Sequence, residues 1–379
     1  MFEANDYGNN EFAHAKIVGV GGCGHNCLNS LIKLGLQDAD FIAVNTDAQD
    51  LLKSLAPKRL QIGDKLTRGL GAGSSMEIGE QAALEAREDI INTLGHADMV
   101  FIIAGLGGGT GSGAAPVIAQ CAKEEIEALT VAIVTLPFAF EGQHRQQQAE
   151  ESLAKLKEYA DAVIVIPNDR LLDEKQLQEN PPKPDFQLVD KLIYKGIRGI
   201  LSLISTPGLI NLDFADVRAV LAKSGTAVIG TGTGTGTGEN APVIAAREAA
   251  AFFLFNEDIE DAQNILISVA GTEENISMFE VTEAANAIHE MASSSANIIW
   301  GAYADNSLGD TVTVTIVASG FDHPTTSASP SAFNGNDYTE KIYKQMIDAC
   351  LQRIQDPATK PAEVAELMRE LRLTLKELS

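Results

Sequence analysis

Two glycine-rich stretches are the residues of this chain best suited to chemistry. The first, "GVGGCGHN", spaces Gly19, Gly21 and Gly24 as G-x-G-x-x-G, and the second, "AGLGGGTGSG" (residues 104–113), has glycine at six of ten positions. Such density marks backbone with positive φ or close approach of the backbone to a ligand. Both stretches follow apolar, strand-like runs and open helical ones, so their amide groups predict a phosphate-binding site.

Two further loops follow predicted strands at the same edge of the sheet. "GLGAGSS" covers residues 69–75, and "AVNTDAQ" (43–49) puts Asn45, Thr46 and Asp47 at a strand end. A lone G-x-G-x-x-G followed by Asp47 is typical of a dinucleotide-binding fold, and any one of these loops could be a tight turn. A nicotinamide site does not require "GGGTGSG", however, and the lysine of a P-loop is missing. The four loops together favour a nucleoside polyphosphate held by backbone amides.

Alternating strand-like and helical runs position these loops. From Ala15 to Asn168, apolar strands separated by amphipathic helices predict a parallel sheet covered on both faces, with ligands at the carboxyl ends of the strands. Residues 186–205 read as one long helix that is apolar almost all round, so we expect it to be buried between two halves of the molecule. Beyond it, further strands and helices predict a second α/β domain. The repeat "GTGTGTGTG", Gly230 to Gly238, is expected to be a mobile surface turn rather than another phosphate cradle.

Composition excludes several classes of function. The chain has 379 residues, 45% of them hydrophobic and 21% charged, as in an ordinary globular protein of two domains or one large one. Its formal net charge of -24 disfavours binding to nucleic acid and to anionic membrane surfaces. We expect no signal peptide and no membrane span, because no apolar run approaches about 20 residues. With four cysteines, a reduced cytoplasmic setting is expected, without a disulfide framework.

The glycine-rich segments, taken together, resemble the tubulin and FtsZ superfamily of GTPases. "GGGTGSG" is the signature of that superfamily. Over about residues 15 to 321 the chain is similar to bacterial-type FtsZ in successive segments: "GVGGCGHN", "AVNTDAQDL", "GLGAG", "LPFAFEG", "IPNDRLL", "GLINLDFADVR" and "NIIWGAYADNSLGD". The resemblance implies a Rossmann-like GTP-binding domain (1–185), a central core helix (186–206) and a C-terminal α/β activation domain (207–321). Residues 322–379 are expected to form a loop and a helical C-terminal extension.

The resemblance also implies roles for individual residues. The implied GTP- or GDP-binding residues are Gly21, Gly22, Gly24, Asn26, Asn45, Gly71, Ala72, Gly73, Gly107, Gly108, Gly109, Thr110, Gly111, Ser112, Glu141, Arg145, Asn168, Phe186 and Asp190. Residues 107–112 form the phosphate loop, in which two hydroxyl groups would add donors. The pair Glu141 and Arg145 would lie at the ribose and phosphates, and Asn168 near the sugar. Phe186 and Asp190 would stack on guanine and hydrogen-bond it.

Catalysis would require groups from a second subunit. Asn211, Asp213 and Asp216 match the family's loop that one subunit inserts into the nucleotide site of the next. Hydrolysis of a phosphoanhydride needs an oriented water and charge neutralisation, which a carboxylate and magnesium would supply. Both aspartates lie at the start of a predicted helix, so helix capping is the alternative.

We therefore expect a cytoplasmic GTPase that uses GTP and magnesium, polymerises with itself into head-to-tail protofilaments, and acts at a division site of a cell or organelle. Division proteins or membrane adaptors are the further partners considered, with no nucleic acid and no direct membrane insertion. One alternative is an FtsZ-like GTP-binding scaffold or modulator whose hydrolysis is slow or lost. A distant alternative is a nicotinamide-dependent oxidoreductase.

Two regions depart from the family pattern. Cys23 and His25 stand where the family usually has small residues, and together with Cys27 they lie too close on one turn to close a tetrahedral metal site, so no resident metal is expected. At the C-terminus the family's linker and docking tail are not apparent. Residues at spacings of four and three, Val364, Met368, Leu371, Leu375 and Leu378, are typical of a coiled-coil seam or of a helix packed on its own domain, and both readings stay open.

Overall fold

The computed structural model describes residues 13–171, 186–206, 208–235, 241–251, 259–272 and 274–321, all within one unit, Met1–Asp322. The expected C-terminal extension and its heptad residues lie outside these ranges. None of the helices in the described ranges is long and apolar enough to cross a bilayer.

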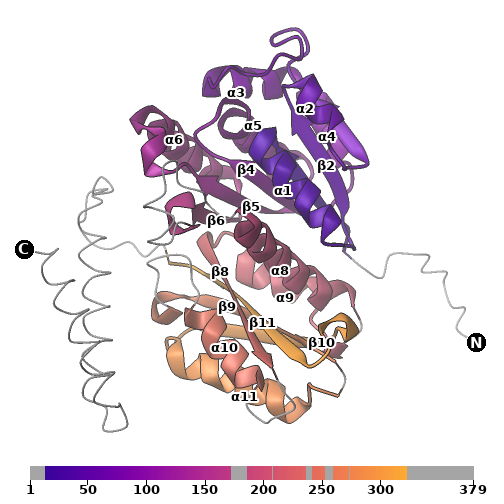
Figure 1. Ribbon diagram of the computed structural model, residues 1–379, viewed down its shortest axis with the longest axis vertical. Helices are drawn as coiled ribbons and strands as arrows, with labels where there is room; N and C mark the ends of the chain where they lie inside the picture. The colour runs from indigo at the N-terminus through magenta and orange to yellow at the C-terminus, as the bar shows by residue number, and fades with distance from the viewer. Residues whose placement is uncertain are drawn as a thin grey trace, which may run out of the picture. The chain divides into compact units, whose positions relative to one another are not determined.

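Eleven strands of the described residues join in one hydrogen-bonded sheet, in the order β3-β2-β1-β4-β5-β6-β8-β11-β9-β10-β7 (Figure 1). The strands in chain order are β1 Ala15–Val20, β2 Asp40–Asn45, β3 Lys58–Gln61, β4 Met99–Gly105, β5 Leu129–Leu136, β6 Ala162–Pro167, β7 Gly208–Ile210, β8 Gly225–Thr235, β9 Asn264–Gly271, β10 Asn297–Ala304 and β11 Thr311–Ser319. All pairs from β3 across to β6 are parallel, whereas β11 pairs antiparallel with β8 and β9. The predicted α/β fold with a parallel-sheet core is confirmed.

Helices cover both faces of this sheet. They are α1 Gly21–Lys33, α2 Ala48–Leu52, α3 Met76–Glu85, α4 Arg87–Leu94, α5 Gly109–Gln120, α6 Gln143–Tyr159, α8 Phe186–Ser205, α9 Phe214–Leu221, α10 Ala241–Ala251 and α11 Met278–Met291. Buried side chains of α1, α8 and α9 form one core, and those of α3, α4, α5 and α6 form a second core on the other face. A third core packs α10 and α11 against β9, β10 and β11. These elements belong to the second half of the molecule, residues 208–321; the first half is residues 13–171.

The long helix α8 lies between α1 and the strands of the second half (Figure 1). Gly196 and Gly199 allow this close approach, because a Cβ on either would touch Ile229 of β8 or Thr315 of β11. The predicted central helix is thus observed, but it is buried along one side rather than all round. Phe186 in its first turn remains 52% exposed.

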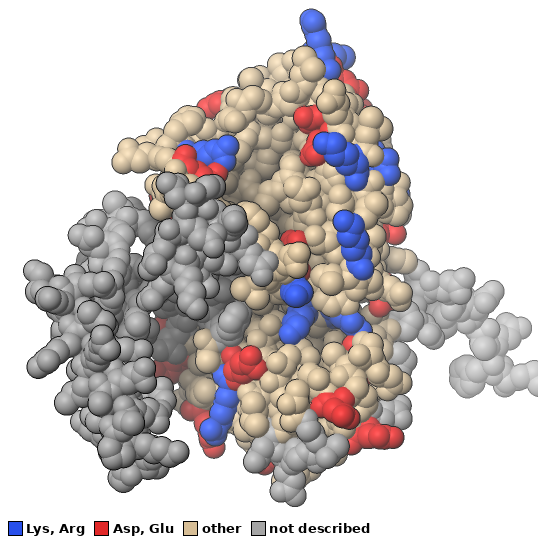
Figure 2. All heavy atoms as spheres, viewed as in Figure 1, with Lys and Arg blue, Asp and Glu red and all other residues tan. Residues whose placement is uncertain are grey.

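Charged side chains of both signs are interspersed on the face that carries α1 and α8 (Figure 2). Lys33 on α1 and Lys191 on α8 are both exposed. The net charge of -24 therefore does not produce a continuous acidic surface on this face.

A short strand pairing joins the two halves. Residues Ala162–Ile164 of β6 lie parallel to Gly225–Ala227 of β8. Asp161, which directly precedes β6, is buried, and its carboxylate accepts hydrogen bonds from the amides of Thr130 at 3.0 Å and Lys223 at 3.2 Å. This aspartate therefore ties three segments of chain together at the joint.

The glycine–threonine repeat is a strand up to residue 235, so the expected surface turn is wrong for residues 230–235. These residues belong to β8 and pair with β11. Helix α10 lies so close to β8 that a Cβ on Gly232 would be 2.0 Å from the carbonyl oxygen of Ala245, and one on Gly234 equally close to that of Ala241. The glycines permit this helix contact, while the alternating threonines are β-branched and favour a strand.

Candidate functional site

The first glycine loop and the phosphate loop meet at the carboxyl ends of two paired strands. β1 leads into α1 and β4 into α5, and the two strands pair in parallel. Gly21 has a φ of 68°, and a Cβ there would lie 3.0 Å from the amide nitrogen of Gly111. Residue 21 must therefore be glycine both for its backbone conformation and for the contact between the loops.

The other two loops pack against the phosphate loop as well. A Cβ on Gly109 would lie 2.9 Å from Cβ of Ala72, in the loop of residues 69–75. From the turn after β2, the hydroxyl of Thr46 hydrogen-bonds that of Thr110 at 2.6 Å. The structure thus brings the four loops together at one edge of the sheet.

The amides at the starts of α1 and α5 carry no side-chain caps. Val20 and Gly108 precede the two helices, neither makes a capping hydrogen bond, and neither first turn contains an acidic residue. The neighbouring helices α2 and α3, by contrast, are capped by Asp47 and Ser75. Free amides and the positive end of the helix dipole make both uncapped ends suitable for phosphate oxygens.

Open space lies beside the same backbone. A Cβ on Gly108 or on Gly73 would meet no atom within 4 Å, and one on Gly22 would meet only the Asp50 carboxylate at 3.7 Å. Asn26, on the second turn of α1, is also exposed. The chain therefore leaves room for a ligand where the uncapped amides lie.

Three of the predicted binding residues serve the loops themselves. Ser112 is fully buried, and its hydroxyl oxygen accepts a hydrogen bond from the amide of Gly107 at 2.8 Å. Gly24 lets α1 approach β4, since a Cβ there would lie 2.2 Å from the carbonyl oxygen of Ile103. The Asn45 side chain bonds to protein groups at both of its ends. Their part in ligand binding stays a prediction.

The residues predicted at the ribose and phosphates lie beside the phosphate loop. Arg145 forms an ion pair with Glu141, whose other carboxylate oxygen accepts from the amide of Phe138 at 3.0 Å. A Cβ on Gly107 would lie 2.9 Å from the carbonyl oxygen of Arg145. Asn168, which follows β6, has a buried side-chain oxygen without a partner among the described residues. A contact of Asn168 with the sugar stays a prediction.

The residues predicted at the base lie at the start of α8. The ring of Phe186 meets the ring of Phe138 edge to face at 6.0 Å, and half of its surface is open. Asp190 lies one turn later on α8. Burial raises its pKa, and the polar side chains of Ser30 and Cys27 on α1 offset the rise only in part. An exposed ring and a half-buried carboxyl suit a flat, hydrogen-bonding ligand.

The three predicted catalytic residues are not brought to these loops. Arg218 of α9 donates to the carbonyl oxygen of Glu127, just before β5 begins, which fixes α9 at the opposite edge of the sheet from the phosphate loop. Asp213 and Asp216 form a capping box at the start of α9. Asn211 accepts from the amide of Gly208 at 2.6 Å. The capping alternative is therefore observed, and within one chain these groups are remote from the phosphate loop.

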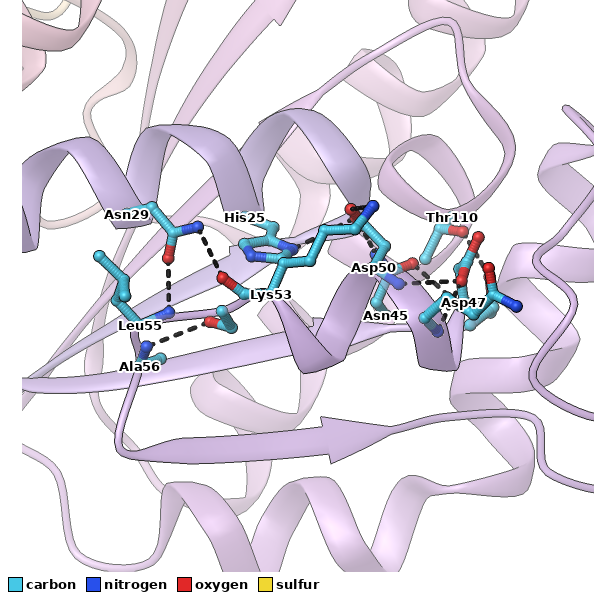
Figure 3. Close-up of polar contacts among 12 residues, drawn as sticks. His25, Asn29, Asn45, Asp47, Asp50, Lys53, Leu55, Ala56 and Thr110 are labelled. Atoms are coloured by element: carbon cyan, nitrogen blue, oxygen red, sulfur yellow. Dashed lines mark hydrogen bonds and ion pairs between the residues drawn. The ribbon is translucent and has the colours of Figure 1, made fainter.

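The site also contains a polar network that the sequence does not indicate. His25 is 1% exposed, and its Nδ1 lies 3.2 Å from Oδ2 of Asp50 in α2 (Figure 3). The same oxygen accepts from Nδ2 of Asn45 at 2.9 Å. Nothing in the spacing of residues 25 and 50 indicates this contact, because it depends on how α1 packs beside α2.

Comparison with known proteins agrees over both halves of the chain. The profile of the Tubulin/FtsZ family, GTPase domain, matches residues 14–176, and that of the FtsZ family, C-terminal domain, matches residues 225–322. A dimeric FtsZ of M. jannaschii is 39% identical, with a TM-score of 0.74 over 85% of this chain and 95% of that one.

Two CetZ proteins of Haloferax volcanii share the fold. CetZ1, a monomer with GDP bound, is 24% identical, with a TM-score of 0.70 over 84% of this chain and 96% of its own. CetZ2, a protofilament with GTPγS bound, is 21% identical, with a TM-score of 0.69 over 89% of this chain and 99% of its own.

Proposed function

The chain belongs to the tubulin/FtsZ family of GTPases, and on that premise we propose that it assembles head to tail and completes its GTPase site where two subunits meet. The observation that carries the proposal is the separation within one chain. The phosphate loop lies at the carboxyl ends of the strands, whereas Asp213 and Asp216 begin a helix fixed at the opposite edge. Stacking subunits head to tail would bring the two ends together.

Guanine nucleotide binding rests on the chain's own groups. The uncapped amides of α1 and α5 would hold the phosphates, Asn168 would lie near the sugar, and Asp190 would hydrogen-bond the base. The GDP and GTPγS bound to the two CetZ proteins support this choice of ligand. Magnesium, when bound with the nucleotide, would neutralise charge on the phosphate oxygens.

The neighbouring subunit would supply the acid–base group. In the capping box, one carboxylate oxygen of each aspartate accepts a hydrogen bond from the other's backbone amide. These two bonds fix both side chains at the start of α9. A carboxylate held in this way can orient a water for in-line attack on the terminal phosphate of the next subunit. The FtsZ dimer and the CetZ2 protofilament support self-association.

We further propose action at a division site in the cytoplasm and the four-part domain organisation set out above. The support is that the C-terminal half matches the profile of the FtsZ family, while the N-terminal half matches that of the Tubulin/FtsZ GTPase domain. The scaffold alternative with slow hydrolysis finds no support in the first loop. His25 is turned into the protein, and Gly21 keeps its contact with Gly111. Membership of a GTPase family argues against the alternative of a nicotinamide-dependent oxidoreductase.

The test is turnover as a function of protein concentration. We expect GTP hydrolysis per molecule to rise steeply with concentration, together with pelleting of polymer on ultracentrifugation, while GTP affinity stays constant. Hydrolysis per molecule that is independent of concentration, without pelleted polymer, would show that one subunit holds the whole site.

A further inference from the structure

The turn of residues 45–50 is tied to the rest of the predicted nucleotide site by several polar contacts. Thr46 bonds through its hydroxyl to Thr110 of the phosphate loop at 2.6 Å. The carbonyl oxygen of Thr46 accepts from the amide of Gly71 at 3.2 Å, in the loop of residues 69–75. A shift of this turn would therefore move its contacts to both neighbouring loops.

Asp50 fixes the turn from the inside. Its Oδ2 accepts from Asn45 Nδ2 at 2.9 Å, and Oδ1 of Asn45 accepts from the amide of Asp47 at 3.2 Å (Figure 3). Lys53 lies 3.9 Å from the other oxygen of Asp50 but is 74% exposed, so solvent screens its attraction. The close partners of the Asp50 carboxylate are thus Asn45 and His25.

The contact with Asp50 places a proton on Nδ1 of His25. A carboxylate only accepts hydrogen bonds, so Nδ1 of His25 is the donor at 3.2 Å. Nε2, the other ring nitrogen, is buried without a hydrogen-bond partner among the described residues. A buried unsatisfied nitrogen destabilises the fold, whereas leucine would fill similar space without that cost. Packing alone therefore does not account for histidine at residue 25.

We propose that His25 is a positioning residue for the nucleotide: through Asp50 and Asn45 it holds the 45–50 turn against the phosphate loop. The inference rests on the proposed nucleotide function and goes beyond it, because the side chain of His25 bonds to Asp50, which is not one of the predicted ligand-binding residues. The hydrogen bond from Nδ1, rather than the volume of the ring, carries the effect.

Two polar substitutions separate these contributions. His25→Asn keeps a donor at the position of Nδ1, and His25→Gln moves its donor outward to the position of Nε2. We expect the dissociation constant for GDP, measured by titration of the full chain, to stay within about twofold of the native value for His25→Asn. For His25→Gln it should rise about tenfold, the loss of one charge-assisted hydrogen bond. His96→Leu, at an exposed histidine, is the matched control and should change nothing.

The outcomes separate this inference from the proposed function. Native protein that fails to bind GDP would overturn both. Native protein that binds GDP, with equal constants for His25→Asn and His25→Gln, would overturn the positioning role alone. Urea unfolding of the nucleotide-free variants gives the second readout. A rise in the dissociation constant that only follows lost stability in both variants would also contradict the inference.

A double-substitution cycle then tests the route through Asp50. If His25 acts through that carboxylate, adding His25→Gln to an Asp50→Ala protein should raise the dissociation constant for GDP by less than about twofold further. A full additional tenfold rise would mean that His25 acts by another route.

Discussion

Asp213 and Asp216 each accept a hydrogen bond from the other's backbone amide, at 3.2 Å to Oδ2 of Asp216 and 3.0 Å to Oδ1 of Asp213. A capping role and a catalytic role therefore coincide in one pair. Substitution by asparagine separates them, because asparagine caps helices as well as aspartate does but carries no charge.

We expect Asp213→Asn to leave the free energy of unfolding within about 0.5 kcal/mol of the native value, whereas Asp213→Ala should lose about 1 kcal/mol of it. Both should lower GTP turnover about a hundredfold at unchanged GTP affinity, the usual contribution of a positioned acid–base group. Phosphate release and chemical denaturation measure the two effects. If Asp213→Asn turned over at the native rate, capping would be its whole role.

Mixing two inactive variants tests completion of the site between subunits. Asp213→Ala binds GTP but cannot activate a neighbour, while Thr110→Arg blocks the phosphate loop but presents an intact Asp213. Each variant alone should hydrolyse GTP at no more than about a hundredth of the native rate, and their mixture should release phosphate clearly faster than either. If both variants pelleted together in one polymer but their mixture hydrolysed GTP no faster than either variant alone, the result would argue against a shared site.

The preference of the nucleotide site for guanine over adenine is predicted to depend on Asp190. Its carboxylate can accept from both N1–H and the exocyclic amine of guanine, whereas adenine presents a bare nitrogen and no amine on that edge. GTP should therefore be preferred over ATP by at least about a hundredfold in competition binding. If ATP supported assembly as well as GTP does, Asp190 would not have this role.

The pH dependence of GDP binding should report on the same carboxyl. Burial raises the pKa of Asp190, so its charged form is lost at a higher pH than that of an ordinary carboxyl near about 3.9. GDP affinity should fall as the pH drops through that raised pKa, while the contribution of Asp190 to nucleotide-free stability moves the other way and is lost as the pH rises through it. Asp190→Asn should bind GDP more weakly and flatten both profiles. Unaltered profiles in the variant would assign the titration to another group.

Gly232→Ala should destabilise the second half. The added methyl carbon would stand 2.0 Å from a backbone oxygen of α10, which cannot swing aside, so a loss of about 1–3 kcal/mol is expected. Denaturant titration measures this loss against Thr235→Ala, a change at an exposed residue of the same strand. Equal stabilities would mean that α10 can retreat without cost.

Much of the fold could be predicted from apolar runs, because a strand such as Ala15–Val20, fully buried on both faces, requires them. For the strand from Gly225 to Thr235, the sequence predicts too early an end, because glycine usually weakens a strand. Glycine is favoured in this strand because α10, which follows later in the chain, packs closely against it.

The candidate site divides in the same way. Convergence of the glycine loops follows from parallel strands, whose carboxyl ends share one edge. Sequence could not tell that Ser112 and Asn45 bond within the loops, since both residue types suit a ligand equally well. Nor could it pair His25 with Asp50, which meet only once two helices are packed.

The pairing of β6 with β8 gives the molecule a definite path for mechanical load. Tension applied along a head-to-tail polymer would pass from the second half to the first through α8 and through the residue pairs from Ala162–Gly225 to Ile164–Ala227. Beside them, the buried carboxylate of Asp161 holds Lys123 and the amide of Lys223. The two halves therefore cannot separate without breaking backbone hydrogen bonds and exposing a buried charge.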